Sequence, residues 1–339
     1  MKDDRGSELE RAVHTSVDAA SPRGRSGRDV SVAAVGEVDA YSASVAGVRL
    51  EAVRTGLGVG PHRVVSLRDD RFLYTSNDIG FPFRSTTTIG DEQAAVAVVI
   101  DAPPGSKWCS IDLEPATVLA YGPGAEHTAN NLAGARVAFA FVDLEQLDGL
   151  ADQHQAAARI PPRGEVQLVA RSAKAQAIAS SFSALSRADD RLPGQLDQQC
   201  DDAARALMLA LSDQHPAKRI GGGKAIDSRR IVHACIDLAH AMGRIPSISE
   251  MCIAAHVSER RLREAFVREF SQPPSRYFRD WALQHARLRL LAGEPPHVTV
   301  TGTAQDLGLF HLGRFAGHYR ALFGEKPSVT LQANARRLA

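Results

Sequence analysis

Long apolar runs and paired cysteines are both missing from this 339-residue sequence. The longest apolar stretch, residues 94–100, has the length of a strand, well short of the ~18 to 20 residues that a membrane-spanning helix requires. No apolar segment follows the first Met, so we expect no secretion signal and a cytoplasmic location without a membrane partner. The cysteines form no C-x-x-C pair, which favours buried thiols over disulfides; they are Cys109, Cys200, Cys235 and Cys252.

Charge is unevenly distributed along the chain, although the net charge is only +1. Residues 225–339 contain 16 Lys and Arg against 10 Asp and Glu, whereas the rest of the chain contains 24 and 29. A basic C-terminal part attached to a mildly acidic body is typical of a DNA-binding domain joined to a second domain.

The N-terminal part has a strand pattern. After residues 1–33, expected to be a flexible tail, short apolar segments alternate with turn clusters such as 102–105 and 122–124. The predicted strands are 63–67, 71–74, 94–100, 117–121 and 136–142. Strands at this spacing predict an antiparallel β-barrel or sandwich, within a domain covering residues 34–215.

A helical hairpin is expected to close this domain, with arms at 172–187 and 195–213. The second arm carries a short heptad pattern of apolar residues: Leu196, Cys200, Ala203 and Leu207. Two interpretations are open, packing on the helix's own domain or contact with a second copy in a homodimer. Residues 216–225, which include three consecutive glycines, are expected to be a linker to a C-terminal domain at 226–339.

The C-terminal domain contains one unit twice, a short apolar helix, a turn and a second helix. The copies run from Ser249 to Phe266 and from Thr301 to Tyr319. Each is a helix-turn-helix pattern, in which the second helix enters a DNA major groove. The helix predicted at 276–291 would span ~24 Å between the two units. Double-stranded DNA is therefore the expected partner.

Helical periodicity separates core residues from candidate DNA contacts in each unit. In the first unit Leu262, Phe266 and Phe270 form the core stripe, and Ser258 is the expected N-cap. The candidate DNA contacts of this unit are Ser258, Arg260, Arg261, Arg263, Glu264 and Arg268. Those of the second are His311, Leu312, Gly313, Arg314, Ala316, Gly317 and Arg320. Arginine can pair with guanine through two hydrogen bonds, which favours DNA contact. The alternative interpretation is that these charged residues form a face exposed to solvent.

These motifs resemble the two-unit DNA-binding domain of the AraC/XylS family of transcriptional regulators. The matching runs are 257–263 with Phe266, 274–277, 308–315 and 319–328. The resemblance places the family's base-reading positions on Arg260, Arg263 and Glu264, then on Leu312, Gly313 and Ala316, with Gly317 beside them. His256 stands where the family usually has Gly or Asn, and Leu309 replaces the usual Phe. RNA polymerase is a further partner that the resemblance implies.

The N-terminal domain resembles, less specifically, the cupin-like sensing domain that such regulators carry. Gly124, His127 and Asn131 fit the G-x-x-H-x-x-x-N part of the second cupin motif. No H-x-H motif is present, so a three-ligand metal site lacks its ligands and no cofactor is expected. The candidate effector pocket comprises Phe81, Phe83, Trp108, Tyr121 and His127. A core position for the aromatic residues and a structural role for His127 as a loop histidine are the alternatives.

The sequence therefore predicts an α+β protein, with an N-terminal antiparallel β-barrel and helical hairpin and a C-terminal all-α domain with two helix-turn-helix units. The predicted function is transcription regulation through sequence-specific DNA binding, controlled by a small-molecule effector, without enzymatic activity. Two rivals remain open: a cupin-type metalloenzyme with a DNA-binding appendage, and a DNA-binding interaction protein that has no effector.

Overall fold

Two antiparallel sheets form the N-terminal part of the computed structural model, which describes residues 28–44, 48–169, 173–188, 192–212, 218–220, 224–293 and 297–338. Within these residues the larger sheet has the order β1-β3-β4-β11-β6-β9-β12-β13. Its strands are β1 (Asp29–Val35), β3 (His62–Arg68), β4 (Leu73–Asp78), β6 (Gln93–Asp101), β9 (Val118–Tyr121), β11 (Arg136–Asp143), β12 (Val166–Val169) and β13 (Lys218–Arg219).

The smaller sheet has the order β2-β5-β10-β7-β8. Its strands are β2 (Val48–Arg54), β5 (Phe83–Ile89), β7 (Lys107–Trp108), β8 (Ile111–Asp112) and β10 (Glu126–Asn131). A short helix, α1 (Val38–Ser44), precedes β2. Side chains from the inner faces of the two sheets share one buried core, so the sheets pack face to face.

Strand β6 shows why apolar residues occupy consecutive positions in this domain. Its even-numbered residues Ala94, Val96 and Val98 pack in the core beneath the helices, and the odd-numbered residues between them pack in the core between the sheets. Successive side chains of a strand point to opposite faces. A strand buried on both faces therefore reads as a continuous apolar run.

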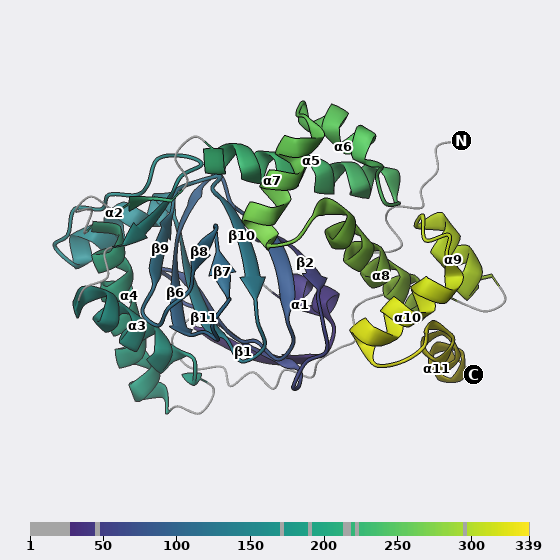
Figure 1. Cartoon of the computed structure of the whole chain (residues 1–339). Helices are drawn as coiled ribbons and strands as arrows, with labels where there is room; N and C mark the ends of the chain where they lie inside the picture. The colour runs from purple at the N-terminus through teal and green to yellow at the C-terminus, as the bar shows by residue number, and fades with distance from the viewer. Residues whose placement is uncertain are drawn as a thin grey trace, which may run out of the picture.

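Helices cover the outer faces of the two sheets from opposite sides of the molecule (Figure 1). The larger sheet is covered by α2 (Leu144–Gln153), α3 (Ala173–Leu185) and α4 (Pro193–Ser212). Helices of the C-terminal part lie against the smaller sheet, with α5 and α7 on β10 and α8 on β2. The C-terminal third of the sequence thus packs on the β-domain.

The C-terminal part is all-helical. Its helices are α5 (Lys224–Met242), α6 (Ile248–Ala255), α7 (Glu259–Phe270), α8 (Pro274–Ala292), α9 (Val300–Asp306), α10 (Leu312–Phe323) and α11 (Pro327–Leu338). They enclose a separate core that contains the aromatic residues Phe266, Tyr277, Trp281, Phe315 and Tyr319. The structure therefore confirms the predicted α+β organisation, with a β-rich N-terminal domain and a helical domain that holds two helix-turn-helix units.

Several predicted boundaries were wrong. The expected N-terminal tail includes β1, because Asp29–Val35 pairs along its length with β3. The expected linker includes β13, whose residues Lys218 and Arg219 pair with β12. Helix α8 begins at Pro274 rather than at residue 276, because proline is well suited to the first turn of a helix. Gly221 to Gly223 lie outside the described residues.

The thiols are free in the structure. Cys109, Cys200 and Cys235 are buried and Cys252 is partly buried, without a disulfide among them. No helix in the described part of the chain has the length and apolar character needed to cross a membrane.

Candidate DNA interface and effector cavity

The first helix-turn-helix unit is closed by capping interactions at both of its helices. At the start of α6, Ser247 and Glu250 form a reciprocal capping box, and Arg244 pairs with the Glu250 carboxylate at 2.7 Å. The turn reverses at His256, whose φ of 53° lies in the left-handed region. Ser258 then caps α7 by accepting a hydrogen bond from the backbone N–H of Arg261. These contacts fix where α7 starts and which face it exposes.

Helix α7 has one buried and one charged, exposed face. Leu262, Phe266 and Phe270 are buried, as predicted, and the Phe270 ring stacks on Tyr277 of α8 at 4.7 Å between centroids. On the exposed face Arg260 pairs with Glu264 at 2.9 Å and Arg263 with Glu259 at 2.6 Å. Exposed ion pairs four residues apart on a helix contribute little to stability. Both arginines can therefore exchange these partners for nucleic acid at little cost.

Arg261 is less exposed than these two arginines. Only 29% of its side chain is exposed, and its guanidinium lies 3.7 Å from Asp227 of α5. The guanidinium also lies 3.9 Å from Glu264 and is therefore placed between α5 and the exposed face of α7. Arg268, one turn further along, is exposed as predicted.

The second unit presents small and basic residues. Thr299 caps α9 by accepting a hydrogen bond from the Gly302 N–H, and Gly308 turns the chain with a φ of 84°. Of the candidate DNA contacts in the second unit, Ala316 is half-buried and the others are exposed: His311, Leu312, Gly313, Arg314, Gly317 and Arg320. A methyl group at Gly313 or Gly317 would meet no atom within 4 Å. The backbone of α10 is therefore open to close approach at both glycines.

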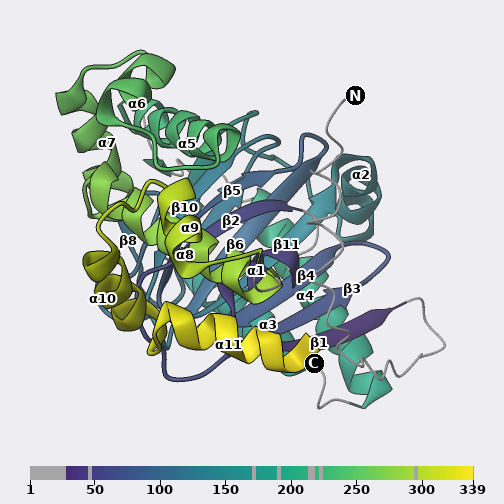
Figure 2. The ribbon, with the colours of Figure 1, turned by 90° about the vertical axis from the view of Figure 1, so that its right-hand side faces the viewer.

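One exposed aromatic was missed by sequence reasoning. Phe310 precedes α10 and is 74% exposed, whereas aromatic residues of the C-terminal core such as Phe315 are buried. Phe310 lies in the turn, outside the apolar stripe of either helix, and this position could have predicted its exposure. Helices α7 and α10 lie on the same side of the molecule, at the left in Figure 2.

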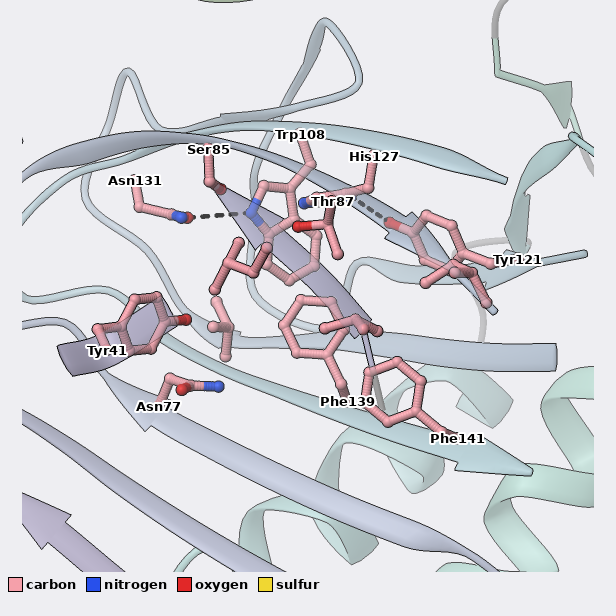
Figure 3. Close-up of a pocket in the computed structure, with 14 residues that line it drawn as sticks. Tyr41, Asn77, Ser85, Thr87, Trp108, Tyr121, His127, Asn131, Phe139 and Phe141 are labelled. Atoms are coloured by element: carbon pink, nitrogen blue, oxygen red, sulfur yellow. Dashed lines mark hydrogen bonds between the residues drawn. The ribbon is translucent and has the colours of Figure 1, made fainter. Parts of the chain in front are cut away.

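A narrow cavity lies between the two sheets of the β-domain (Figure 3). Its volume is about 30 Å³, room for two or three water molecules. Aromatic and aliphatic side chains dominate its wall, with a few polar groups; the lining residues are Tyr41, Val48, Leu50, Asn77, Ser85, Thr87, Ile89, Trp108, Tyr121, His127, Asn131, Val137, Phe139 and Phe141. Small-molecule sites in proteins commonly have this composition.

Hydrogen bonds fix three of the predicted pocket residues in this wall. Trp108 donates through Nε1 to Asn131 Oδ1 at 3.0 Å, and the Tyr121 hydroxyl lies 2.7 Å from His127 Nδ1 (Figure 3). His127 is in β10 and buried, so its prediction as a loop residue was wrong. Burial, with a smaller contribution from the Arg229 charge, lowers the pKa of His127 to about 3. The imidazole is therefore neutral near pH 7.

Phe81 and Phe83 do not line the cavity and belong to the adjacent core. Phe81 stacks on His62 at 3.8 Å, and Phe83 packs on Tyr41 at 5.1 Å between ring centroids. The prediction that these two phenylalanines form the pocket was wrong, because both rings are covered by neighbours that lie far away in sequence.

The residues proposed as a dimer seam are buried within the chain itself. Cys200, Ala203 and Leu207 are at most 2% exposed and pack with α3 and the larger sheet, and Leu196 is partly buried there. The packing of these side chains agrees with the first interpretation of the heptad pattern, in which the helix packs on its own domain. They offer little surface to a second copy.

Polar contacts join the cavity-bearing domain to the first helix-turn-helix unit. The Thr128 hydroxyl donates to Glu269 of α7 at 2.7 Å, and Arg84 of β5 donates to the Phe270 carbonyl at 2.8 Å. On α8, Arg287 pairs with Glu37 at 2.8 Å and with Glu325 at 2.7 Å. The C-terminal end of α7 is therefore docked on the smaller sheet, whereas its N-terminal turns are exposed.

Metal-binding geometry is not evident in the described ranges, where no group of three or more His, Cys, Asp or Glu side chains is placed to hold an ion. Among the described residues that line the cavity, His127 is the one histidine, and it is hydrogen-bonded to Tyr121.

Comparisons with known proteins match the C-terminal domain. A family described as a helix-turn-helix domain matches residues 251–333. A probable thc operon regulatory protein of Rhodococcus erythropolis is 34% identical over 103 residues, 30% of this chain and 31% of the relative. The XylDLEGF operon transcriptional activator 1 of Pseudomonas putida is 38% identical over 86 residues, 25% of this chain and 26% of the relative.

A solved structure adds to these relatives. A probable AraC family transcriptional regulator from Rhodopseudomonas palustris is 35% identical, and the match covers 31% of this chain and 96% of that one, with a TM-score of 0.29. The two operon regulators named above are matched over less than a third of their own length. Through its double helix-turn-helix domain, this chain belongs to the AraC/XylS family of transcriptional regulators.

Proposed function

We propose that this protein regulates transcription by binding specific double-stranded DNA sequences, and that a small molecule bound in the β-domain controls this activity. The observation that carries the proposal is the pair of helix-turn-helix units, each with an exposed face on its second helix. Residues 225–339, which hold both units, also carry an excess of six positive charges. A basic domain of this kind binds DNA phosphates and reads bases with a few side chains.

The two units are suited to different tasks. Arg260 and Arg263 are exposed near the start of α7, where a guanidinium reaches the guanine edge, and Glu264 can accept from a cytosine amine. In α10 the open faces of Gly313 and Gly317 permit close approach of the sugar-phosphate chain, with Arg314 and Arg320 as phosphate partners. The first unit therefore supplies most base discrimination, and the second supplies affinity and register.

The cavity between the sheets is the proposed effector site. Trp108, Tyr121 and His127 line it, and the strand that carries His127 also contacts α7 through the next residue, Thr128. A ligand that moves β10 would therefore alter the docking of α7. Action as a homodimer, with an interface other than the α4 seam, and contact with RNA polymerase are further parts of this proposal.

Selection of binding sites from random DNA with the intact protein tests the DNA-binding function. We expect one enriched sequence, with an affinity that falls steeply as salt rises because phosphate contacts release counterions. A folded protein that enriches no sequence and shows no salt-dependent binding would contradict the proposal. Sedimentation of the intact protein, free and on the selected DNA, tests the homodimer.

A further inference from the structure

We infer that the effector cavity takes a small, uncharged molecule that carries a hydrogen-bond donor and acceptor side by side, such as a carboxamide, and that Asn77 recognises this group. The inference rests on the proposed role of the cavity. It identifies the ligand by its chemistry, from the polar and charged groups around the space.

Asn77 is a polar group of the wall that has no hydrogen-bond partner among the described residues. It lies on β4, is 1% exposed, and lines the cavity, yet neither its Nδ2 nor its Oδ1 atom has a hydrogen-bond partner. Two other polar side chains of the wall are paired, Asn131 with Trp108 and His127 with Tyr121. A buried polar group without a partner destabilises the fold, so such groups in native proteins are as a rule satisfied. A carboxamide supplies both the acceptor and the donor that the Asn77 amide requires.

The charge of the wall favours a neutral ligand. None of the described lining residues is Lys, Arg, Asp or Glu. Burial lowers the pKa of His127 to about 3 and raises that of Tyr121 well above its ordinary value, so both are neutral near pH 7. Arg229 is close enough to lower the pKa of His127, but it does not line the cavity, and its charge also acts on Glu269. A charged ligand would lose its hydration without gaining an ion-pair partner.

The apolar part of the wall favours a thin ligand. The Phe139 and Phe141 rings are nearly parallel, 6.2 Å apart, and the Trp108 ring lies 5.4 Å from Phe139. The volume of about 30 Å³ admits a molecule of a few heavy atoms directly. A planar ring requires rotation of wall side chains, which ligand binding commonly produces.

Two pairs of probes separate charge from shape. Acetamide and acetate have nearly the same shape, as do benzamide and benzoate, and only the second member of each pair is charged at pH 7. We expect acetamide or benzamide to raise the melting temperature of the intact protein, with no effect of the matching anion at equal concentration and ionic strength. Stabilisation by an anion as strong as that by its amide, or no stabilisation by either amide at 100 mM, would refute the inference.

Substitution of Asn77 tests the residue assigned to recognition. Asn77→Leu removes the amide from an apolar wall with little change in size, and Asn77→Ala serves as a second variant if the first fails to fold. We expect either folded variant to lose at least tenfold in affinity for the stabilising amide. A folded variant that binds it as tightly as the wild-type protein would exclude Asn77 as the recognition residue.

A DNA-binding measurement distinguishes this inference from the proposed function. If the amide stabilises the protein and changes its affinity for the selected DNA, both the ligand chemistry and the effector role of the cavity are supported. If the amide stabilises the protein without any effect on DNA binding, the ligand chemistry holds and the effector role of the cavity fails. If the protein binds no specific DNA sequence with or without the amide, the proposed function is refuted and the ligand chemistry is unaffected.

Discussion

Thr128 Oγ1 donates a 2.7 Å hydrogen bond to Glu269 Oε2 and thereby joins strand β10 to the C-terminal end of α7. The preceding residue, His127, faces the cavity, because successive side chains of a strand point to opposite sides. The wall of the cavity and the docking site of the first recognition helix are therefore adjacent positions of one strand. The side chains of His127 and Thr128 are both buried, so a displacement of His127 also displaces Thr128.

The carboxyl group of Glu269 is expected to make stability depend on pH. Glu269 is 2% exposed, and burial raises its pKa above the ordinary value of 4.5, although the Thr128 hydrogen bond and the Arg229 charge act in the opposite direction. The folded protein therefore holds this proton more tightly than the unfolded chain. Its free energy of unfolding should fall as the pH rises from below 4.5 through the raised pKa.

Glu269→Gln isolates that contribution. The difference in free energy of unfolding, variant minus wild type, should increase as the pH rises from 4 to 7, since glutamine does not titrate. Urea unfolding of both proteins at a series of pH values measures it. A difference that is flat across this range would mean that the pKa of Glu269 is not raised.

Arg263→Ala and Arg320→Ala are expected to affect DNA binding in different ways. The first should remove ~1 to 3 kcal/mol of discrimination at one base pair, since Arg263 is exposed near the start of α7. The second should weaken binding to all sequences by a similar factor, since Arg320 lies late in α10 and is placed to meet phosphate. Binding-site selection at one fixed salt concentration measures both. If Arg263→Ala selects the wild-type site with equal stringency, α7 reads bases through other residues.

Gly313→Ala should raise stability and lower DNA affinity together. Alanine favours helix over glycine by ~0.8 to 1.0 kcal/mol, and the added methyl meets no neighbour within 4 Å. The same methyl would stand on the face proposed to approach DNA. Gly149→Ala is the matched control, because Gly149 also lies in a helix, α2, with no atom in reach, on the far side of the molecule. Equal DNA affinity for both variants would argue against close approach at Gly313.

Leu207→Ala should lower the free energy of unfolding by ~2 to 5 kcal/mol, because Leu207 is fully buried within the chain's own core. The oligomeric state of the folded protein should stay unchanged. Chemical unfolding and sedimentation of the same samples provide the two measurements. A variant of wild-type stability that has become monomeric would restore the seam as an interface between copies.

The sequence revealed the strands and helices whose burial follows a simple period. Strands β3, β6, β9 and β11 were predicted from apolar segments, and the faces of α7 and α10 from steps of three and four residues. By contrast, β5 and β10 carry Ser, Thr, Asn and His where a buried strand ordinarily carries Val or Ile. One face of each lines the polar side of the cavity, and the other meets the C-terminal helices. The pattern of residues within each strand reveals neither the cavity on one face nor the helices on the other.

The cavity residues were predicted only in part for a related reason. Trp108, Tyr121 and His127 were identified as aromatic or motif residues, whereas Tyr41 and Asn77 reach the same space from α1 and β4. Their convergence depends on the pairing of strands that are distant in sequence. The residues proposed to contact DNA need no such pairing, since each set lies on a single helix and its N-cap.

The pairing of β13 with β12 limits how far the DNA-binding domain can travel. Leu168 pairs with Lys218 and Gln167 with Arg219, and α5 begins at Lys224. Four residue steps separate Ile220 from Lys224, a contour length of ~14 Å. While β13 stays paired, the start of α5 is confined to a sphere of that radius around the sheet edge. Detachment of this two-residue strand would extend the span from Ser212 to Lys224 to ~40 Å. The few backbone hydrogen bonds between β12 and β13 therefore determine which of these two lengths limits the position of α5.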